Sequence, residues 1–203
     1  MYHKISENIF NCNNCPTRCD GESKMNYQFT LDVNFAEEQE EYVREKINLH
    51  KGYNAVKCLK DGYPDIEVYY KNQLIKYLEV KAQRRTFMSV QRKLKNSSLC
   101  PSETVALNLS DLLRYFKIEE STNIETSIVW VLMNRPCIVP QGEKHFYYQT
   151  TKFLKKIYKN NKENRKFRRK SGKGDIVDGV HKGVTVNYHF SLNELNRWMF
   201  KRV

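Results

Sequence analysis

The feature that most constrains the fold is the stretch from residue 53 to residue 83, which holds three short apolar runs separated by turn residues. The runs YNAVKCL, DIEVYYK and LIKYLEVKAQ occupy residues 53–59, 65–71 and 74–83, and KDGYP lies between the first two. Runs of this length and composition are typical of β-strands. Each is apolar on both alternating positions near its centre, which favours a sheet covered by helices on both faces.

The flanking sequence supplies those helices. Apolar residues from Phe35 to Ile47 recur at helical spacing and predict an amphipathic helix over residues 34–50. Further helices are expected over 86–96 and 110–117, from residue 152, and from Ser191, where Glu194 completes a capping-box spacing. Residues 125–134 and 183–190 are expected to be strands. The pattern predicts an α/β (α+β) fold with a mixed central sheet flanked by helices.

The charge of the chain is strongly positive and unevenly distributed. The formal net charge is +12, and residues 152–173 contain eleven basic residues and one acid, Glu163. Such a block attracts polyanions, so nucleic acid is the favoured partner, with membranes and acidic protein surfaces as alternatives. The first residues lack the apolar core of a secretory signal, and no run approaches the roughly 18 apolar residues of a membrane span. We therefore expect a cytoplasmic protein that does not bind membranes.

Polar side chains interrupt the second and third predicted strands. Glu79, Lys81 and Gln83 share one face of the third strand, and Asp65 and Glu67 share a face of the second. Carboxylates on a covered sheet need a cation or a hydrogen-bond partner. Such a partner would be available if the two polar sets met on one side of the sheet.

The hairpin register decides whether they meet. A two-residue turn at residues 72–73 would pair Asp65 with Val80 and separate the charges. An odd-length loop, or a bulge with the same effect, would place Asp65 beside Lys81 and Glu67 beside Glu79. We predict the odd loop or the bulge.

These residues carry a resemblance to a known family. Pro64-Asp65, thirteen intervening residues and Glu79-Val80-Lys81, preceded by a helix and a strand, resemble the PD-(D/E)xK nuclease superfamily, which has the restriction-endonuclease-like fold. The resemblance covers roughly residues 34–135. It implies a metal-dependent endodeoxyribonuclease of resolvase, restriction or phage type. Asp65, Glu79 and the Val80 carbonyl would bind Mg²⁺ or Mn²⁺, and Lys81 would stabilise developing negative charge.

Two further residues are candidates for the same site. Gln83 extends the motif to ExKxQ, which resembles part of the superfamily, although an ordinary polar residue at a strand end is an equal alternative. Family members often add an acid from the first helix, where the candidates are Glu37, Glu38, Glu40 and Glu41. We choose Glu40, which keeps helical spacing to Val43 and Ile47. Glu67 is a candidate for an outer position around the metal.

The cysteines suggest a second metal site in a small amino-terminal arm, residues 1–24, ahead of a nuclease-like domain over 25–203. Cys12, Cys15 and Cys19 have loop-borne spacing suited to Zn²⁺ or an iron–sulfur cluster, but a tetrahedral site needs a fourth ligand. Cys100 is the first choice, ahead of Cys58, Cys137 and His3, and unligated cysteines are the alternative. Iron–sulfur exonucleases of this superfamily carry a QxxxY element, whereas Gln91 here is followed by Lys95, which argues against that subfamily.

Basic residues near the motif and in the 152–173 segment are candidates for contacts to DNA. They are Arg84, Arg85, Arg92, Lys93, Arg165, Lys166, Arg168, Arg169 and Lys170. A homodimer is plausible because cutting two strands usually takes two active sites. Two rival functions are a catalytically inactive nuclease-fold protein that binds nucleic acid or regulates, and a cysteine–metal interaction protein whose basic tract binds RNA or protein.

Overall fold

The computed structural model describes residues 29–83, 86–133, 135, 137–140, 142–168, 176–177, 180–181 and 186–200. Its helices are α1 (Phe29–Asn48), α2 (Val90–Lys93), α3 (Leu109–Thr122) and α4 (Thr151–Asn161), with 3-10 turns at Lys162–Arg165 and Leu192–Glu194. Its strands are β1 (Tyr53–Lys57), β2 (Ile66–Tyr70), β3 (Gln73–Gln83), β4 (Thr104–Asn108), β5 (Glu125–Leu132), β6 (His145–Thr150), β7 (Lys166–Arg168), β8 (Ile176–Val177), β9 (Val180–His181), β10 (Val186–Ser191) and β11 (Asn196–Trp198).

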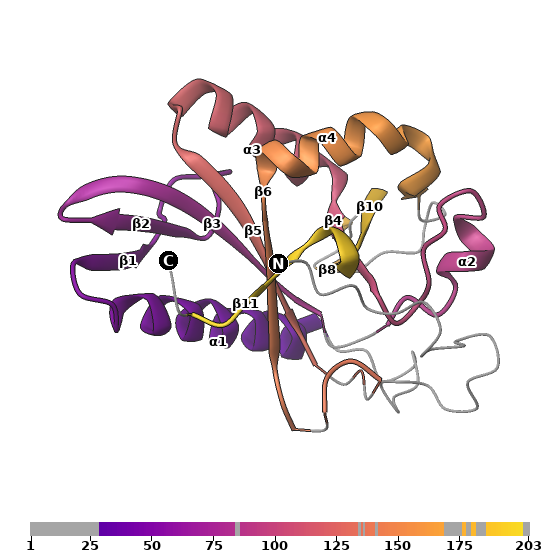
Figure 1. The fold of residues 1–203 in the computed structure, drawn as a ribbon, viewed down its shortest axis with the longest axis horizontal. Coiled ribbons are helices and arrows are strands. Elements are labelled where there is room, and N and C mark those ends of the chain that lie inside the picture. Colours follow the sequence, from indigo (N-terminus) through magenta and orange to yellow (C-terminus); the bar gives the residue numbers. More distant parts are fainter. Residues whose placement is uncertain are drawn as a thin grey trace.

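Six strands form the main sheet in the order β1-β2-β3-β5-β6-β11 (Figure 1). Neighbouring strands are antiparallel except β3 and β5, which run parallel. The connection between these two strands contains α2, β4 and α3. Strand β4 belongs to a second sheet of order β4-β10-β7, and β8 pairs with β9. The predicted mixed sheet is confirmed, and the arrangement is consistent with a restriction-endonuclease-like core.

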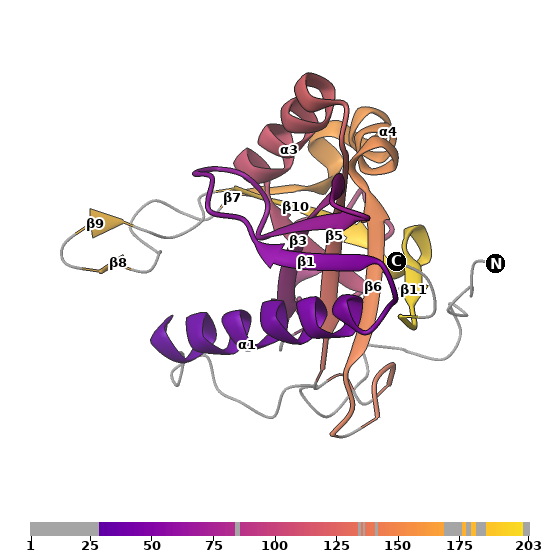
Figure 2. The ribbon, with the colours of Figure 1, turned by 90° about the vertical axis from the view of Figure 1, so that its left-hand side faces the viewer.

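Helices cover both faces of the main sheet, as Figure 2 shows with α1 on one side and α3 and α4 on the other. On the α1 side, Val43 and Ile47 pack in one apolar core with Leu78 and Val80 of β3. On the α3 side, the core contains Tyr77 together with residues of β5, α3, α4 and β10. The two faces of β3 therefore pack in different cores, which explains why its sequence is apolar at both odd-numbered and even-numbered positions.

The β2–β3 hairpin contains the predicted bulge. Its turn is Lys71-Asn72, whose φ angles of 48° and 65° match the left-handed conformation of a type I′ turn. A register shift lies between Val68 and Tyr69. The bulge is confirmed, but the predicted partners are wrong by two residues: Glu67 lies opposite Tyr77 rather than Glu79. A two-residue slip keeps every side chain on its face, so the polar sets still meet.

The carboxyl-terminal prediction is partly wrong. Ser191 and Glu194 form the predicted capping box, but it caps only the 3-10 turn Leu192–Glu194. Leu195 is extended, and the next three residues pair with β6 as strand β11, so the expected helix does not continue. The helix expected over 86–96 is also shorter, because only Val90–Lys93 is helical. In the part of the chain that the structure describes, no helix has the length and apolarity needed to cross a membrane.

Candidate functional site

The site is built where β2 begins beside the centre of β3. Asp65 directly precedes β2, and its backbone carbonyl accepts a hydrogen bond of 2.8 Å from the Cys58 amide. Its side-chain Oδ2 accepts a second 2.8 Å bond from the Val80 amide. The register that pairs Ile66 with Leu78 places Asp65 next to Glu79. The aspartate is thus held on both sides by neighbouring strands.

Glu79 is the most buried acid of the site, with 2% of its surface exposed. The Lys81 ammonium forms an ion pair with Glu79 Oε1, and 34% of the lysine side chain is exposed. The Tyr115 hydroxyl, from α3, donates a 2.5 Å hydrogen bond to Glu79 Oε2. Both carboxylate oxygens therefore have a protein donor, one on the exposed side and one inside the core.

Burial dominates the electrostatics of the site. Burial raises the pKa of Glu79 to about 7, and the charge of Asp65 raises it while Lys81 lowers it. Burial likewise raises the pKa of Asp65, against the opposing charge of Lys81. Burial lowers the pKa of Lys81, but the charges of Glu79 and Asp65 outweigh it, so that pKa lies above its usual value. The lysine is therefore a stable cation between two acids.

Glu40 of α1 lies within electrostatic range of this group. Burial raises the pKa of Glu40, Lys57 and Lys81 lower it, and the charge of Glu79 raises it. Glu40 in turn contributes to the raised pKa of Asp65. The other candidates on the helix, Glu37, Glu38 and Glu41, are exposed, whereas Glu40 is half-buried. The structure thus brings together Asp65, Glu79 and Lys81, with Glu40 in electrostatic range of them.

Gln83 lies in a different set of contacts. Its amide nitrogen donates a 2.8 Å hydrogen bond to the Ala106 carbonyl of β4. Its amide oxygen lies 3.5 Å from the guanidinium of the buried Arg135. The side chain therefore connects the end of β3 to the second sheet, which matches the alternative of a polar residue at a strand end.

Glu67 also has protein partners of its own. Its Oε1 forms a 2.8 Å ion pair with the Lys60 ammonium, and its Oε2 accepts a 2.8 Å bond from the Tyr69 hydroxyl. These partners lower the pKa of Glu67 although its burial raises it. Lys60 also lies 5.3 Å from the ring centroid of Tyr63. This cluster orders the 58–64 loop that leads into Asp65.

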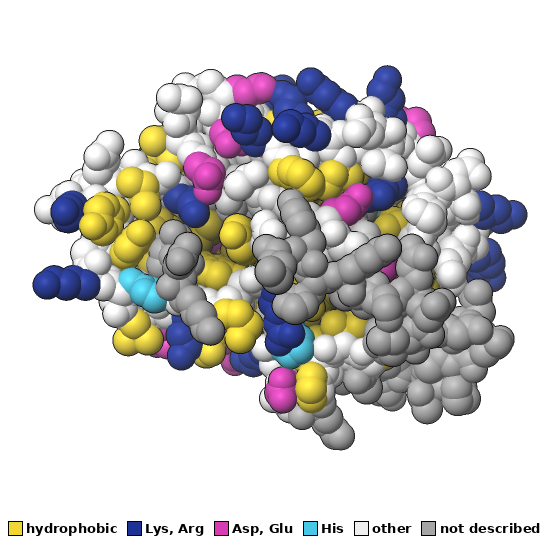
Figure 3. Space-filling model, viewed as in Figure 1, with side chains coloured by type: hydrophobic (Ala, Val, Ile, Leu, Met, Phe, Trp, Pro, Cys, Tyr) yellow, Lys and Arg dark blue, Asp and Glu magenta, His cyan; other side chains and the backbone are white. Residues whose placement is uncertain are grey.

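The basic candidates fall into three groups. Arg92, Lys93, Lys166 and Arg168 are exposed or half-buried, and Lys93 lies 5.6 Å from the ring centroid of Phe167, so α2 and β7 are neighbours. Figure 3 shows Lys and Arg side chains gathered over α3 and α4 and at the α2 edge of the molecule. The prediction for Arg165 needs correction: it is buried and forms a 2.6 Å ion pair with Glu194, so it is not open to a phosphate. The third group, Arg84, Arg85, Arg169 and Lys170, lies outside the described residues.

The cysteine prediction falls largely on residues outside the described ranges, namely Cys12, Cys15, Cys19 and the rest of the 1–24 arm. Cys100 is half-buried, and its sulfur lies 3.3 Å from the Ser102 hydroxyl. Within the described ranges, no three His, Cys, Asp or Glu side chains are close enough together to form a metal site. Both the cysteine site and a metal at Asp65 and Glu79 therefore stay predictions.

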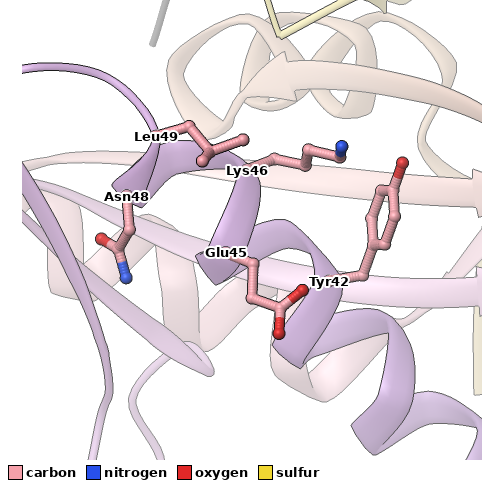
Figure 4. A pocket seen from close by; sticks show the side chains of 5 residues that line it. All are labelled: Tyr42, Glu45, Lys46, Asn48 and Leu49. Carbon is pink, nitrogen blue, oxygen red and sulfur yellow. The ribbon is translucent and has the colours of Figure 1, made fainter.

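A pocket lies elsewhere, on the carboxyl-terminal half of α1, where Tyr42, Glu45, Lys46, Asn48 and Leu49 line it (Figure 4). None of the candidate catalytic residues contributes to it. Lys46 lies 5.1 Å from the ring centroid of Tyr42 along its wall. The pocket is therefore separate from the acidic site in its lining residues.

Tyr115, which bonds to Glu79 across 36 positions of sequence, was not predictable from the sequence. Its only signal was the helical apolar pattern of LLRYF, which identifies a buried position and not its hydroxyl partner. Tyr115 has 2% of its surface exposed, as a core residue would. No spacing rule connects it to β3.

Comparisons with known proteins find similarity among solved structures alone. No protein-family model matches the chain, and no curated protein matches it. Among solved structures, the chain is similar to Hjc, a Holliday junction resolvase from the archaeal hyperthermophile Archaeoglobus fulgidus. That similarity has a TM-score of 0.33 and 14% sequence identity and covers 54% of this chain and 72% of that chain. A likeness at this level carries no argument about activity, so the site is interpreted from its own geometry.

Proposed function

We propose that this protein is a metal-dependent endodeoxyribonuclease that hydrolyses phosphodiester bonds of DNA. The supporting observation is that the acids Asp65 and Glu79 lie side by side on adjoining strands with the Lys81 ammonium beside them. Their carboxyl pKa values are raised, chiefly by burial, as is typical of functional sites. A purely structural role would be served as well by apolar residues at these core positions.

The donor set fits a divalent cation. Mg²⁺ takes oxygen ligands and is commonly held by one or two carboxylates, with water and substrate phosphate completing the shell. Asp65 and Glu79 would supply the carboxylates, Glu40 an outer one, and the Val80 carbonyl remains a predicted ligand. Asp65 and Glu79 share the single cation of Lys81, and the charge of Glu40 adds to their repulsion, so added positive charge would relieve it.

The residues of the chain then have separate tasks. When bound, the cation would lower the pKa of water and neutralise charge on the phosphate. The Lys81 ammonium, whose side chain is one-third exposed, would stabilise negative charge that develops on the reacting phosphate. The Val80 amide would keep the Asp65 carboxylate pointed toward Glu79 through its 2.8 Å bond. The Glu67–Lys60 pair would hold the loop before Asp65 in place.

DNA is the proposed polyanion. The exposed cations of α2 and β7 lie on neighbouring elements, and Phe167 beside Lys93 adds an aromatic surface. Phosphate contacts of this kind give affinity without sequence preference. A homodimer would place two such sites on one duplex, and we include it in the proposal as the arrangement that cuts both strands.

The test is nicking of supercoiled plasmid with Mg²⁺ or Mn²⁺ by the wild type, Asp65→Asn and Lys81→Met. Both variants should lose at least about 100-fold in rate while DNA binding, measured by fluorescence anisotropy, survives. Lys76→Met is the matched control, because Lys76 lies on the same strand but pairs with Glu125 at 3.1 Å. It should nick like the wild type.

The second candidate function is a protein that binds nucleic acid through the same fold without cutting it. The exposed cations of α2 and β7 alone would support this role. Equal behaviour of the wild type, Asp65→Asn and Lys81→Met in the nicking assay, with DNA binding intact, would favour it and refute the nuclease. A gel comparison of linear, nicked, branched and single-stranded DNA would then identify the preferred substrate of either protein.

A further inference from the structure

Tyr115 belongs to the connection between β3 and β5, and its hydroxyl bonds directly to an acid of the site. We infer that Tyr115 is a positioning residue, which fixes the rotation of the Glu79 carboxylate so that Oε1 is the oxygen presented to a divalent cation. The inference rests on the proposed function.

The hydroxyl of Tyr115 is fixed by the helix that carries it. Its bond to Glu79 Oε2 is 2.5 Å long, and both side chains are 2% exposed. Leu112 and Phe116 of the same helix are buried in the core on this side of the sheet. The Arg114 guanidinium lies 5.5 Å from the Tyr115 ring centroid and pairs with Asp111 at 2.7 Å. The phenol therefore has little freedom to leave Oε2.

The two oxygens of Glu79 differ because their partners differ. Oε2 is bound by a buried aromatic side chain on a packed helix, whereas Oε1 is bound by Lys81, whose flexible side chain is one-third exposed. A glutamate carboxylate rotates broadly about its last torsion unless a bond restrains it. Tyr115 supplies that restraint from the inside. Oε1 consequently lies on the side of Lys81, the partly exposed partner of Glu79.

Groups that hold a metal ligand in place without touching the metal typically contribute 10-fold to 100-fold in metal affinity. Removing only the hydroxyl should therefore weaken cation binding while leaving the ring in the core. Tyr188 offers a matched comparison, since it is fully buried in the same core and no partner for its hydroxyl is found among the described residues. Tyr188→Phe removes the same atom without touching the site.

The experiment is Mn²⁺ titration by calorimetry on the wild type, Tyr115→Phe and Tyr188→Phe. We expect Tyr115→Phe to bind Mn²⁺ at least about 10-fold more weakly, and Tyr188→Phe to match the wild type. Phe116→Leu, which removes part of the core packing of α3 but keeps the hydroxyl, should lower the melting temperature while weakening Mn²⁺ binding much less than Tyr115→Phe does. This comparison separates loss of the bond from loosening of the helix.

The outcomes distinguish this inference from the proposed function. Equal Mn²⁺ affinity of the wild type and Tyr115→Phe, with Asp65→Asn weakened, would overturn the positioning role and leave the nuclease proposal standing. A similar loss of affinity in Phe116→Leu would also overturn it. A wild type that neither binds Mn²⁺ nor nicks DNA would remove both.

Discussion

Arg135 shows at the scale of one residue how the second sheet is attached to the main one. Its side chain is fully buried, and its guanidinium donates hydrogen bonds to the Ser102 and Thr104 carbonyls at 3.1 and 2.9 Å. The Gln83 amide oxygen lies near the same group. A buried cation held by carbonyls is costly to remove, because its acceptors are then left without a donor.

We expect Arg135→Met to lower the free energy of unfolding by about 3 kcal/mol or more, measured by urea titration. Arg44→Met is the control, since Arg44 forms a partly exposed pair with Glu41 on α1 and should change stability by less than about 1 kcal/mol. A similarly small effect of both changes would contradict a structural role for Arg135.

Gln83 gives a second residue-scale prediction. Because its amide bonds to Ala106 and not to the acids, Gln83→Leu should lower the melting temperature more than it lowers the nicking rate of the folded protein. Its readouts are thermal unfolding followed by circular dichroism and the plasmid assay at a temperature where the variant is folded. A loss of activity near that of Lys81→Met, with unchanged stability, would assign Gln83 to catalysis.

Strand β1 illustrates the next scale, that of whole elements. It is an edge strand, and such edges can pair with other chains. Asn48, at the end of α1, accepts a 2.6 Å bond from the Ala55 amide and donates one of 3.2 Å to the Ala55 carbonyl. Its side chain thus imitates a neighbouring strand. Asn48→Ala should increase self-association, seen by light scattering, whereas Asn54→Ala on the same strand should not.

His189, on strand β10, is expected to make the stability of the β4-β10-β7 sheet sensitive to acid. Burial lowers the pKa of His189 to about 4, while its Nδ1 lies 3.2 Å from the Arg165 carbonyl. The unfolded chain takes up this proton near pH 6.5 and the folded one only near 4, so the stabilisation is complete above 6.5 and falls as the pH drops toward 4. When the pH falls from 7.5 to 4.5, the free energy of unfolding of the wild type should decrease by about 2–3 kcal/mol more than that of His189→Gln. Urea titration at the two pH values measures this difference. His50→Gln, away from this sheet, should follow the wild type.

The elements also show where sequence reasoning succeeds. The three strands over 53–83 and the strand over 125–134 are strongly apolar, and all four are present with ends shifted by a few residues. β4 and β6 were missed, and the last helix was predicted in place of β11. The local sequence pattern could not reveal β11, because this strand forms only through its pairing with β6, which is a tertiary contact. The acids were predictable because β2 and β3 are adjacent in sequence, whereas the tyrosine of α3 was not.

The positive charge is a property of the whole molecule. The exposed cations of α2 and β7 come from segments about 75 positions apart and meet beside Phe167. Lys166 is half-buried and ion-paired with Glu163, so the exposed cations are Arg92, Lys93 and Arg168. If these three contact phosphates, replacing them with Gln should weaken DNA binding on every sequence. The magnitude of the slope of log association constant against log salt concentration, measured by fluorescence anisotropy, should then fall by up to about three. Lys46→Gln and Lys51→Gln, at the α1 end, should leave it unchanged.

The parallel pairing of β3 with β5 has a kinetic consequence. The hairpin that carries Asp65 and Glu79 closes over only a few residues, so it can form early in folding. Tyr115 reaches Glu79 only after the long crossover through α2, β4 and α3 has docked, and contacts of such high sequence separation form slowly. An early folding species would therefore expose the acid pair before its tyrosine arrives. A divalent cation present during refolding would therefore encounter Asp65 and Glu79 on the hairpin before α3 docks and Tyr115 bonds to Glu79.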